Sequence, residues 1–237
     1  MKIKIAHLYY DLMNLYGEQG NILALKEAFN KQNIDTEIDT LTIKDDIDFK
    51  KYNIFYIGSG SKESLLITLE DIKKYQKDIK NAIKKDIYFI STGNSHELFG
   101  KSLTYDNITY DGLNIFNYYS KENSKRLTGE CFMKCSDLKD IIIGFQNRAS
   151  IIQINDHHLF EVISGNQDNF KSSYEGYHEN NFFGTYLIGP LLIRNPHLTD
   201  LIVKDILIKK GKNFHEDKDT PEYKAYNEYL KNFYNEK

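Results

Sequence analysis

Apolar residues recur along the first half of the chain as short runs that alternate with helical spacings. Such runs predict strands at Lys2–Tyr9, Ile34–Ile43, Tyr52–Ile57 and Asp86–Ile90. Between them, Asn21–Phe29 and the long stretch Ser64–Lys85 place apolar residues on one face of a helix. Strands that alternate with helices indicate a mostly parallel sheet with right-handed crossovers.

The second half of the chain has a different pattern. Turn residues crowd Tyr105–Asn117, and strands are predicted at Ile141–Ile154 and Leu159–Ser164. These strands either extend the sheet or form an antiparallel layer on it. A helix is expected from about Leu198 to Lys210. The predicted fold class is therefore α/β, a mostly parallel sheet flanked by helices, with extra antiparallel strands in the second half of a domain over residues 1–210.

Residues 211–237 form a strongly charged, tyrosine-rich tail. Tyr223, Tyr226 and Tyr229 recur at helical spacing within Pro221–Tyr234, which predicts a helix. This helix either packs on its own domain or faces a partner, and tyrosines of this kind more often pack on their own domain.

Composition narrows the classes of function. The 237 residues suffice for one full core, and the net charge of -3, with lysines interleaved among acids, argues against nucleic acid as the main ligand. No apolar run is long enough to span a bilayer, and the start of the chain runs directly into a strand pattern, so a cytoplasmic location is expected. The two cysteines, Cys131 and Cys135, have no second pair nearby and predict neither a metal site nor a disulfide. No cofactor is expected.

Two predicted strands end in small residues, at Gly58-Ser59-Gly60-Ser61 and at Thr92-Gly93-Asn94-Ser95. In an open parallel sheet, ligands bind beyond the carboxyl ends of the strands. A tight turn after a buried strand can aim a nucleophile up from the sheet, and a neighbouring glycine turn can offer N–H groups to an oxyanion. The segment HELFGKSL that follows the second turn has a helix-like pattern.

Four segments, taken in order, give the chain a family resemblance. They are Tyr9–Ile22 (YYDLMNLYGEQGNI), Ile57–Gly60, the GFQN segment that ends at Asn147, and Gly184–Leu192 (GTYLIGPLL). They resemble YPDLLNLYGDRGNI, a glycine turn, GFEN and GTYLHGPLL in class I glutamine amidotransferases of the GatD/cobyric-acid-synthase type. The resemblance covers about residues 5 to 208. It implies a flavodoxin-like amidotransferase fold, a Mur-ligase-like synthetase (MurT-type) as partner, and a role in cell-wall precursor (peptidoglycan) amidation.

The chain departs from this family at its catalytic positions. The family elbow CGGYQLLG aligns with Gly93–Gly100, so Gly93 replaces the cysteine nucleophile, or Thr92 does in a register shifted by one residue. The family's histidine base in GTYLHGPLL aligns with Ile188. Arg148 follows GFQN where the family has histidine. Neither glycine nor isoleucine can perform thiolate attack or proton transfer, so the resemblance implies a pseudoenzyme that has lost its glutaminase.

The resemblance also supplies candidate ligand-binding residues for a small molecule in a vestigial glutamine pocket. They are Gly58, Ser59, Gly60, Thr92, Gly93, Asn94, Ser95, Gln146, Asn147 and Arg148. The alternative is an active amidotransferase or hydrolase with relocated catalytic residues, in which Thr92 or Ser95 works with His96 or His178. Against this alternative, the hydroxyls are expected to serve the turn and helix cap, and His96 is expected to be an exposed first-turn residue.

Overall fold

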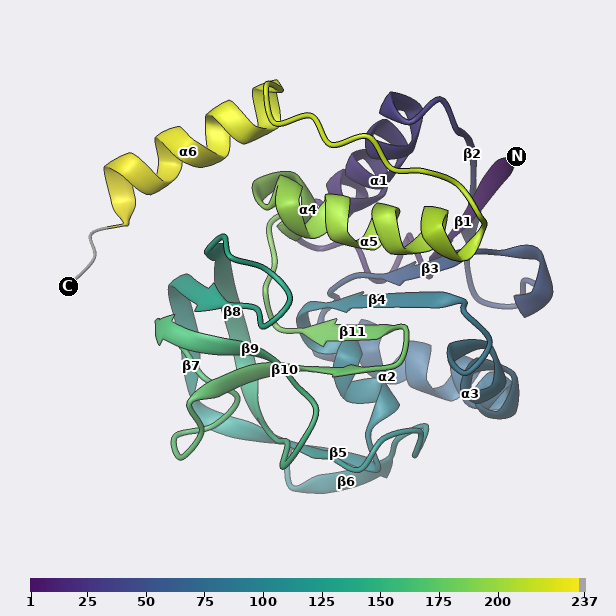
Figure 1. Cartoon of the computed structure of the whole chain (residues 1–237). Helices are drawn as coiled ribbons and strands as arrows, with labels where there is room; N and C mark the ends of the chain where they lie inside the picture. Colours follow the sequence, from purple (N-terminus) through teal and green to yellow (C-terminus); the bar gives the residue numbers. More distant parts are fainter. Residues whose placement is uncertain (235–237) are drawn as a thin grey trace.

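The computed structural model describes residues 1–234 as one mixed sheet with helices on both faces (Figure 1). Its parallel half has the order β2–β1–β3–β4–β11. These strands are β1 (Lys2–Leu8), β2 (Asp35–Leu41), β3 (Ile54–Ile57), β4 (Tyr88–Thr92) and β11 (Phe182–Thr185). Every residue of β3 and β4 is buried, as expected for central parallel strands covered on both faces.

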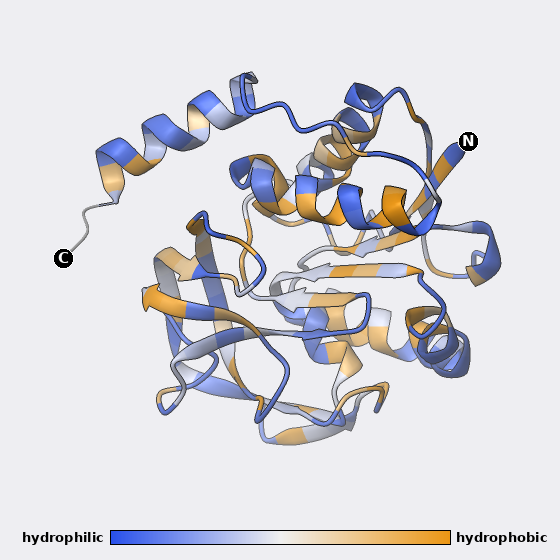
Figure 2. Ribbon diagram, viewed as in Figure 1, coloured by the Kyte–Doolittle hydropathy of each residue, from blue (hydrophilic) through white to orange (hydrophobic). Residues whose placement is uncertain are grey.

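Helices cover the two faces of the parallel half. On one face lie α1 (Gln19–Lys31), α4 (Leu191–Arg194) and α5 (Pro196–Lys209), and on the other lie α2 (Lys62–Ile72) and α3 (Gln76–Ile83). Leu25 of α1 and Ile202 of α5 join one apolar cluster, and Leu69 of α2 joins the other. Figure 2 shows hydrophobic residues on the central strands and also on the helices and the antiparallel strands. Among the described residues, no helix is long and apolar enough to cross a membrane.

The antiparallel strands continue this sheet, so the prediction that they either extend it or form a separate layer is resolved in favour of extension. β10 (Tyr174–Glu179) pairs antiparallel with β11, and β9 (His158–Ser164) follows it. The remaining strands are β5 (Ser102–Tyr105), β6 (Ile108–Asp111), β7 (Tyr119–Lys134) and β8 (Ile142–Gln153). The mostly parallel α/β class with added antiparallel strands is confirmed.

The helix-like pattern at residues 96–103 was misleading. Gly93–Phe99 forms a short 3₁₀ helix (η3), and Ser102–Tyr105 then forms strand β5, which pairs with both β6 and β7. Leu98, Phe99 and Leu103 of this segment are buried in the core, where the Phe99 ring packs on Phe89 of β4 and Phe182 of β11. Tertiary pairing has overridden the local pattern.

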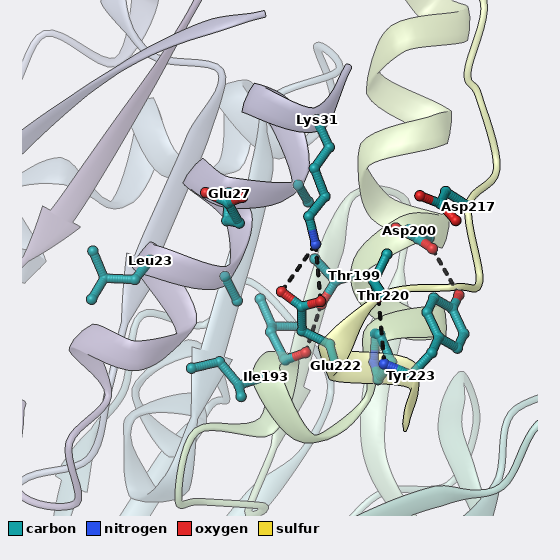
Figure 3. A pocket seen from close by; sticks show the side chains of 14 residues that line it. Leu23, Glu27, Lys31, Ile193, Thr199, Asp200, Asp217, Thr220, Glu222 and Tyr223 are labelled. Carbon is teal, nitrogen blue, oxygen red and sulfur yellow. Dashed lines mark hydrogen bonds and ion pairs between the residues drawn. The ribbon is translucent and has the colours of Figure 1, made fainter. Parts of the chain in front are cut away.

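The charged tail carries helix α6 (Pro221–Phe233), which docks on the domain through its tyrosines. Tyr223 donates a hydrogen bond to Asp200 Oδ2 at 2.7 Å, and Lys31 Nζ lies 2.9 Å from Glu222 Oε2 (Figure 3). Tyr226 is 4 % exposed, and its hydroxyl donates to the carbonyl of Ile141 at 2.7 Å. The contacts of Tyr223 and Glu222 border a cavity of about 260 Å³ between α1, α5 and the start of α6. The domain division at residue 210 stays a prediction, and residues 235–237 lie outside the described part.

The docking of α6 is expected to depend on Tyr226. The change Tyr226→Ala removes a buried ring packed edge-on against His197, which costs about 3 kcal/mol for a large buried side chain. Hydrogen exchange measured by mass spectrometry should therefore speed up at least about tenfold in the amides of α6. Asn227→Ala, at the next and exposed position, is the control and should leave exchange unchanged. Equal protection in the Tyr226 variant would show that the tyrosine does not anchor the helix.

Candidate functional site

Two turns meet where β3 and β4 end. Ser59 Oγ donates to Asn94 Oδ1 at 3.1 Å, and the N–H of Gly60 donates to the same oxygen at 3.0 Å. Asn94 Nδ2 in turn donates to the carbonyl of Gly60 at 2.9 Å. The two strand-end turns therefore lie together, and one asparagine side chain joins them.

Gly93 occupies the first position after β4 and has a backbone conformation that side chains rarely adopt. Its φ is +67°, in the left-handed region, which costs a residue with a Cβ roughly 1–2 kcal/mol. A Cβ placed on Gly93 would lie 2.5 Å from Ser59 Oγ and 3.1 Å from Ile188 Cγ2. Gly93 and Ile188 are therefore neighbours, and Ser59 fills the space into which a side chain at position 93 would project.

The N–H groups of the glycine turn already have acceptors inside the protein. The amide of Ser59 donates to Glu18 Oε1 at 3.2 Å, while the amide of Gly60 donates to Asn94. Glu18 is fully buried, also accepts from the amide of Tyr16 at 2.8 Å, and has its pKa raised by burial. These two donors are therefore not available to a ligand oxyanion while Glu18 and Asn94 keep these positions.

A cavity of about 340 Å³ opens beside the two turns. Six of the candidate ligand-binding residues line it, namely Ser59, Gly60, Gly93, Asn94, Asn147 and Arg148. The other candidates, Gly58, Thr92, Ser95 and Gln146, are buried and do not line the cavity. Three charged lining residues were missed from the sequence: Lys62, Glu122 and Arg126. Arg126 Nε donates to Asn147 Oδ1 at 2.5 Å, which holds a guanidinium at the cavity wall.

Arg148 lies beneath this cavity as a buried cation. Its guanidinium donates to the carbonyls of Ser150, at 2.8 Å, and of Asp168, at 3.2 Å, and packs 4.1 Å from the centre of the Tyr186 ring. The Gln146 side chain accepts from Arg148 Nε at 3.1 Å. The N–H groups of Arg148 donate to carbonyls, and its guanidinium plane packs on an aromatic ring. These contacts hold Arg148 in one position at the cavity floor.

Three buried carboxyl groups surround Arg148. Glu97 accepts hydrogen bonds from Ser150, Tyr105 and Tyr186, and burial raises its pKa. Burial also raises the pKa of Glu175 to about 7. Asp168 has its pKa raised first by burial and second by the charge of Glu175. Two acids that share one buried site cannot both ionise freely, so protons are retained here at mildly acidic pH.

The histidines and hydroxyls of the relocated-triad alternative are not paired with one another. Thr92 Oγ1 lies 2.6 Å from the Tyr56 hydroxyl, and Ser95 Oγ bonds to Ser91 and to the carbonyl of Ile57. His96 Nδ1 contacts the carbonyl of Gly93 at 2.8 Å, and His178 Nδ1 that of Phe182 at 2.9 Å.

The expectation that His96 is exposed is wrong. The side chain is fully buried, because Tyr186 and Tyr118 from the second half of the chain cover it. Burial lowers the pKa of His96 to about 3, so the imidazole is neutral.

Both cysteines lie away from the lining of this cavity. Cys131, on β7, and Cys135 are buried free thiols, and burial raises the pKa of Cys131 to about 11, which disfavours the thiolate. Within residues 1–234, no group of three or more His, Cys, Asp or Glu side chains could hold a metal ion.

Comparisons with known proteins agree on one family. The profile of the CobB/CobQ-like glutamine amidotransferase domain matches residues 4–196. The subunit GatD of lipid II isoglutaminyl synthase (glutamine-hydrolyzing) from Staphylococcus aureus is 30 % identical over 211 residues, 89 % of this chain and 86 % of that protein. The protein of the same name from Streptococcus pneumoniae is 30 % identical over 213 residues, 88 % and 82 % of the two chains.

A solved glutaminase domain of Trypanosoma brucei CTPS with bound acivicin also matches. It covers 63 % of this chain and 68 % of its own, with a TM-score of 0.31 and 8 % identity. At those values the likeness carries no argument about chemistry.

The crowding at Gly93 predicts a specific pattern of stability. Gly93→Ala should lower the free energy of unfolding by about 2–5 kcal/mol, from the left-handed φ and the clash with Ser59 together. Adding Ser59→Gly should recover about 1–3 kcal/mol of this loss, because it removes the clash but not the backbone cost. Urea unfolding of the wild type and the single and double variants measures both values. A Gly93→Ala variant as stable as the wild type would refute the crowding.

The buried acids predict that stability falls as pH rises through neutrality. The pKa of Glu175 is raised in the fold, so its contribution is complete below its unfolded pKa and is lost as pH rises through about 7. Between about pH 5 and pH 8, the wild type should lose roughly 2–3 kcal/mol of unfolding free energy relative to Glu175→Gln. Comparing the two proteins by urea unfolding cancels the opposite trend of the buried histidines. If the unfolding free energies of the two proteins changed with pH in parallel, a raised pKa of Glu175 would be contradicted.

Proposed function

This chain belongs to the CobB/CobQ-like glutamine amidotransferase family, and on that premise we propose that it is a GatD-like subunit that has lost glutaminase chemistry. In this proposal it assembles with a Mur-ligase-like (MurT-type) synthetase that amidates a cell-wall precursor. Its two relatives are named as subunits of lipid II isoglutaminyl synthase, which supports a partner of this kind.

The observation that carries the loss of chemistry is the contact of Gly93 with Ser59 and Ile188. The family resemblance assigns the nucleophile to position 93 and the base to position 188, and the structure holds these two positions side by side. Glycine offers no atom to attack a carbonyl, and isoleucine cannot take a proton from a nucleophile. Loss of a nucleophile in such an enzyme costs on the order of 10⁶ in kcat.

The state of the glycine turn supports the same proposal. A glutaminase needs free N–H donors directed at the oxyanion of its tetrahedral intermediate. Here the amides of Ser59 and Gly60 are bonded to Glu18 and Asn94. The alternative in which Thr92 or Ser95 is the nucleophile is not favoured, because neither hydroxyl forms a hydrogen bond with a histidine.

The cavity beside the turns is proposed to keep a ligand role without catalysis. Lys62, Glu122 and Arg126 place both signs of charge around it, which suits a small zwitterion such as an amino acid. Retention of such a ligand would explain why a chain without nucleophile and base keeps a polar, charged cavity at this edge of the sheet.

The proposal predicts no ammonia release from glutamine, by the pure protein or by its complex with the synthetase. The measurement is a coupled glutamate dehydrogenase assay, with a GatD relative that carries cysteine and histidine as the positive control. Turnover at ordinary enzyme rates, about 1 s⁻¹ or more, would refute the loss of glutaminase chemistry.

A native pull-down tests the partner separately. The tagged protein is expected to recover a Mur-ligase-like synthetase in stoichiometric amount, identified by mass spectrometry. Tyr226→Ala, which is expected to disturb α6 alone, shows whether the tail takes part in the assembly. Recovery of no ATP-dependent synthetase would refute the subunit role while leaving the chemical argument intact.

A further inference from the structure

A cleft of about 960 Å³ opens over the antiparallel half of the sheet and shares no lining residue with the cavity beside the two turns. Its floor consists of two rows of side chains from paired strands. One row joins Ser102, Tyr119 and Gln153, and the next joins Thr109, Thr104, Lys121 and Ile151. Rows two residues apart on one face of a sheet are separated by about 6–7 Å. The floor is therefore one face of the sheet, several side chains wide.

One wall of this cleft is a loop, residues 169–174, fixed by its own hydrogen bonds. Asn169 Nδ2 donates to the carbonyl of Ile152 at 3.0 Å, and Asn169 Oδ1 accepts from the amide of Lys171 at 3.0 Å. The amide of Tyr174 donates to Ser172 Oγ at 2.9 Å. Because the loop is tied to β8 and to itself, the wall is formed before any ligand arrives.

Aromatic side chains stand open in the cleft. Phe170 is 72 % exposed, while Tyr119 and Tyr174 are 46 % and 42 % exposed. The His158 ring stacks on Tyr174 with centroids 4.3 Å apart and an interplanar angle of 10°, which fixes the orientation of that tyrosine. Several large rings left open around one cleft are typical of a binding surface rather than of an ordinary protein exterior.

Apart from these rings and the side chains of Ile151, Ile152 and Ile154, the lining is polar and nearly uncharged. Hydroxyl and amide side chains from Ser102, Thr104, Thr109, Gln153, Asn155 and Ser173 contribute donors and acceptors. The charged groups are Lys121 and Lys171, and among the described residues no carboxylate lines the cleft. This combination suits a molecule that has apolar faces, many hydroxyl groups and at most a negative charge.

We propose that this cleft binds a saccharide, with a preference for one that carries an acidic group. The C–H faces of a sugar ring pack on Tyr119, Phe170 and Tyr174, and its hydroxyls exchange hydrogen bonds with the polar lining. Lys121 and Lys171 pair with the carboxylate or phosphate. A single-stranded nucleic acid would also stack on aromatic rings, but it needs a basic groove along its phosphates, and two lysines in a chain of net charge -3 do not form one. The inference is independent of the glutaminase and partner proposals.

The test follows amide chemical shifts of the ¹⁵N-labelled full chain during titration to about 10 mM with maltose, di-N-acetylchitobiose or a glucuronate-containing disaccharide. At least one saccharide should shift the signals of Tyr119, Lys121 and Lys171. The glucuronate disaccharide should bind more tightly than a neutral disaccharide of the same size. Tyr174→Ala and Phe170→Ala should each weaken binding at least about tenfold.

Phe233→Ala is the matched control, because Phe233 is an exposed aromatic residue on α6, outside the cleft lining. It should leave the affinity unchanged, and circular dichroism should show that every variant is folded. The proposal would be overturned if no saccharide shifted the cleft signals, or if both cleft variants bound like the wild type. Saturable binding of a thymidine decanucleotide at the same residues, without saccharide binding, would overturn it in favour of nucleic acid.

Discussion

The contact between the turns after β3 and β4 determines which side chains fit at the carboxyl edge of this sheet. The two strands are parallel neighbours in the register Ile57 opposite Ser91, so the turns that follow them occupy one small volume. Ser59 fills that volume, which requires that Gly93 have no side chain, and Asn94 then bonds across both turns. A side chain at position 93 and the present position of Ser59 exclude each other. The same residues that stabilise the turns thereby leave no space for a side chain at position 93.

The sequence predicted four of the five parallel strands and missed β11. It succeeded best for β3 and β4, because they are apolar runs buried on both faces, a pattern that needs no knowledge of partners. It failed for β7, the sixteen residues Tyr119–Lys134, whose charged and polar side chains interrupt any alternation. Such a strand forms because β8 and β9 supply hydrogen-bonding partners far away in the sequence. The helix-like pattern at residues 96–103 failed for the same reason, because pairing of β5 outweighs a local preference.

The candidate site was predicted in part. The rule that ligands gather at the carboxyl ends of parallel strands correctly placed Ser59 beside Asn94. It could not place Glu18, whose carboxylate reaches the Ser59 amide across 41 positions, nor the burial of His96 under Tyr186. The position of Glu18 and the burial of His96 both depend on which segments, distant in the sequence, pack over the turns. The assignment of individual residues to ligand binding stays a prediction.

The buried carboxyl groups connect the two halves of the molecule and limit how the site can move. Glu97 lies on η3, directly after the Gly93 turn, yet its hydrogen-bond donors come from β5, β8 and Tyr186 in the second half. Moving the turn would leave a buried carboxyl group without donors, at a cost of about 1–3 kcal/mol for each lost partner. The turn is therefore held in one position by the antiparallel half. Such rigidity preserves the shape of the cavity edge formed by Gly93 and Asn94.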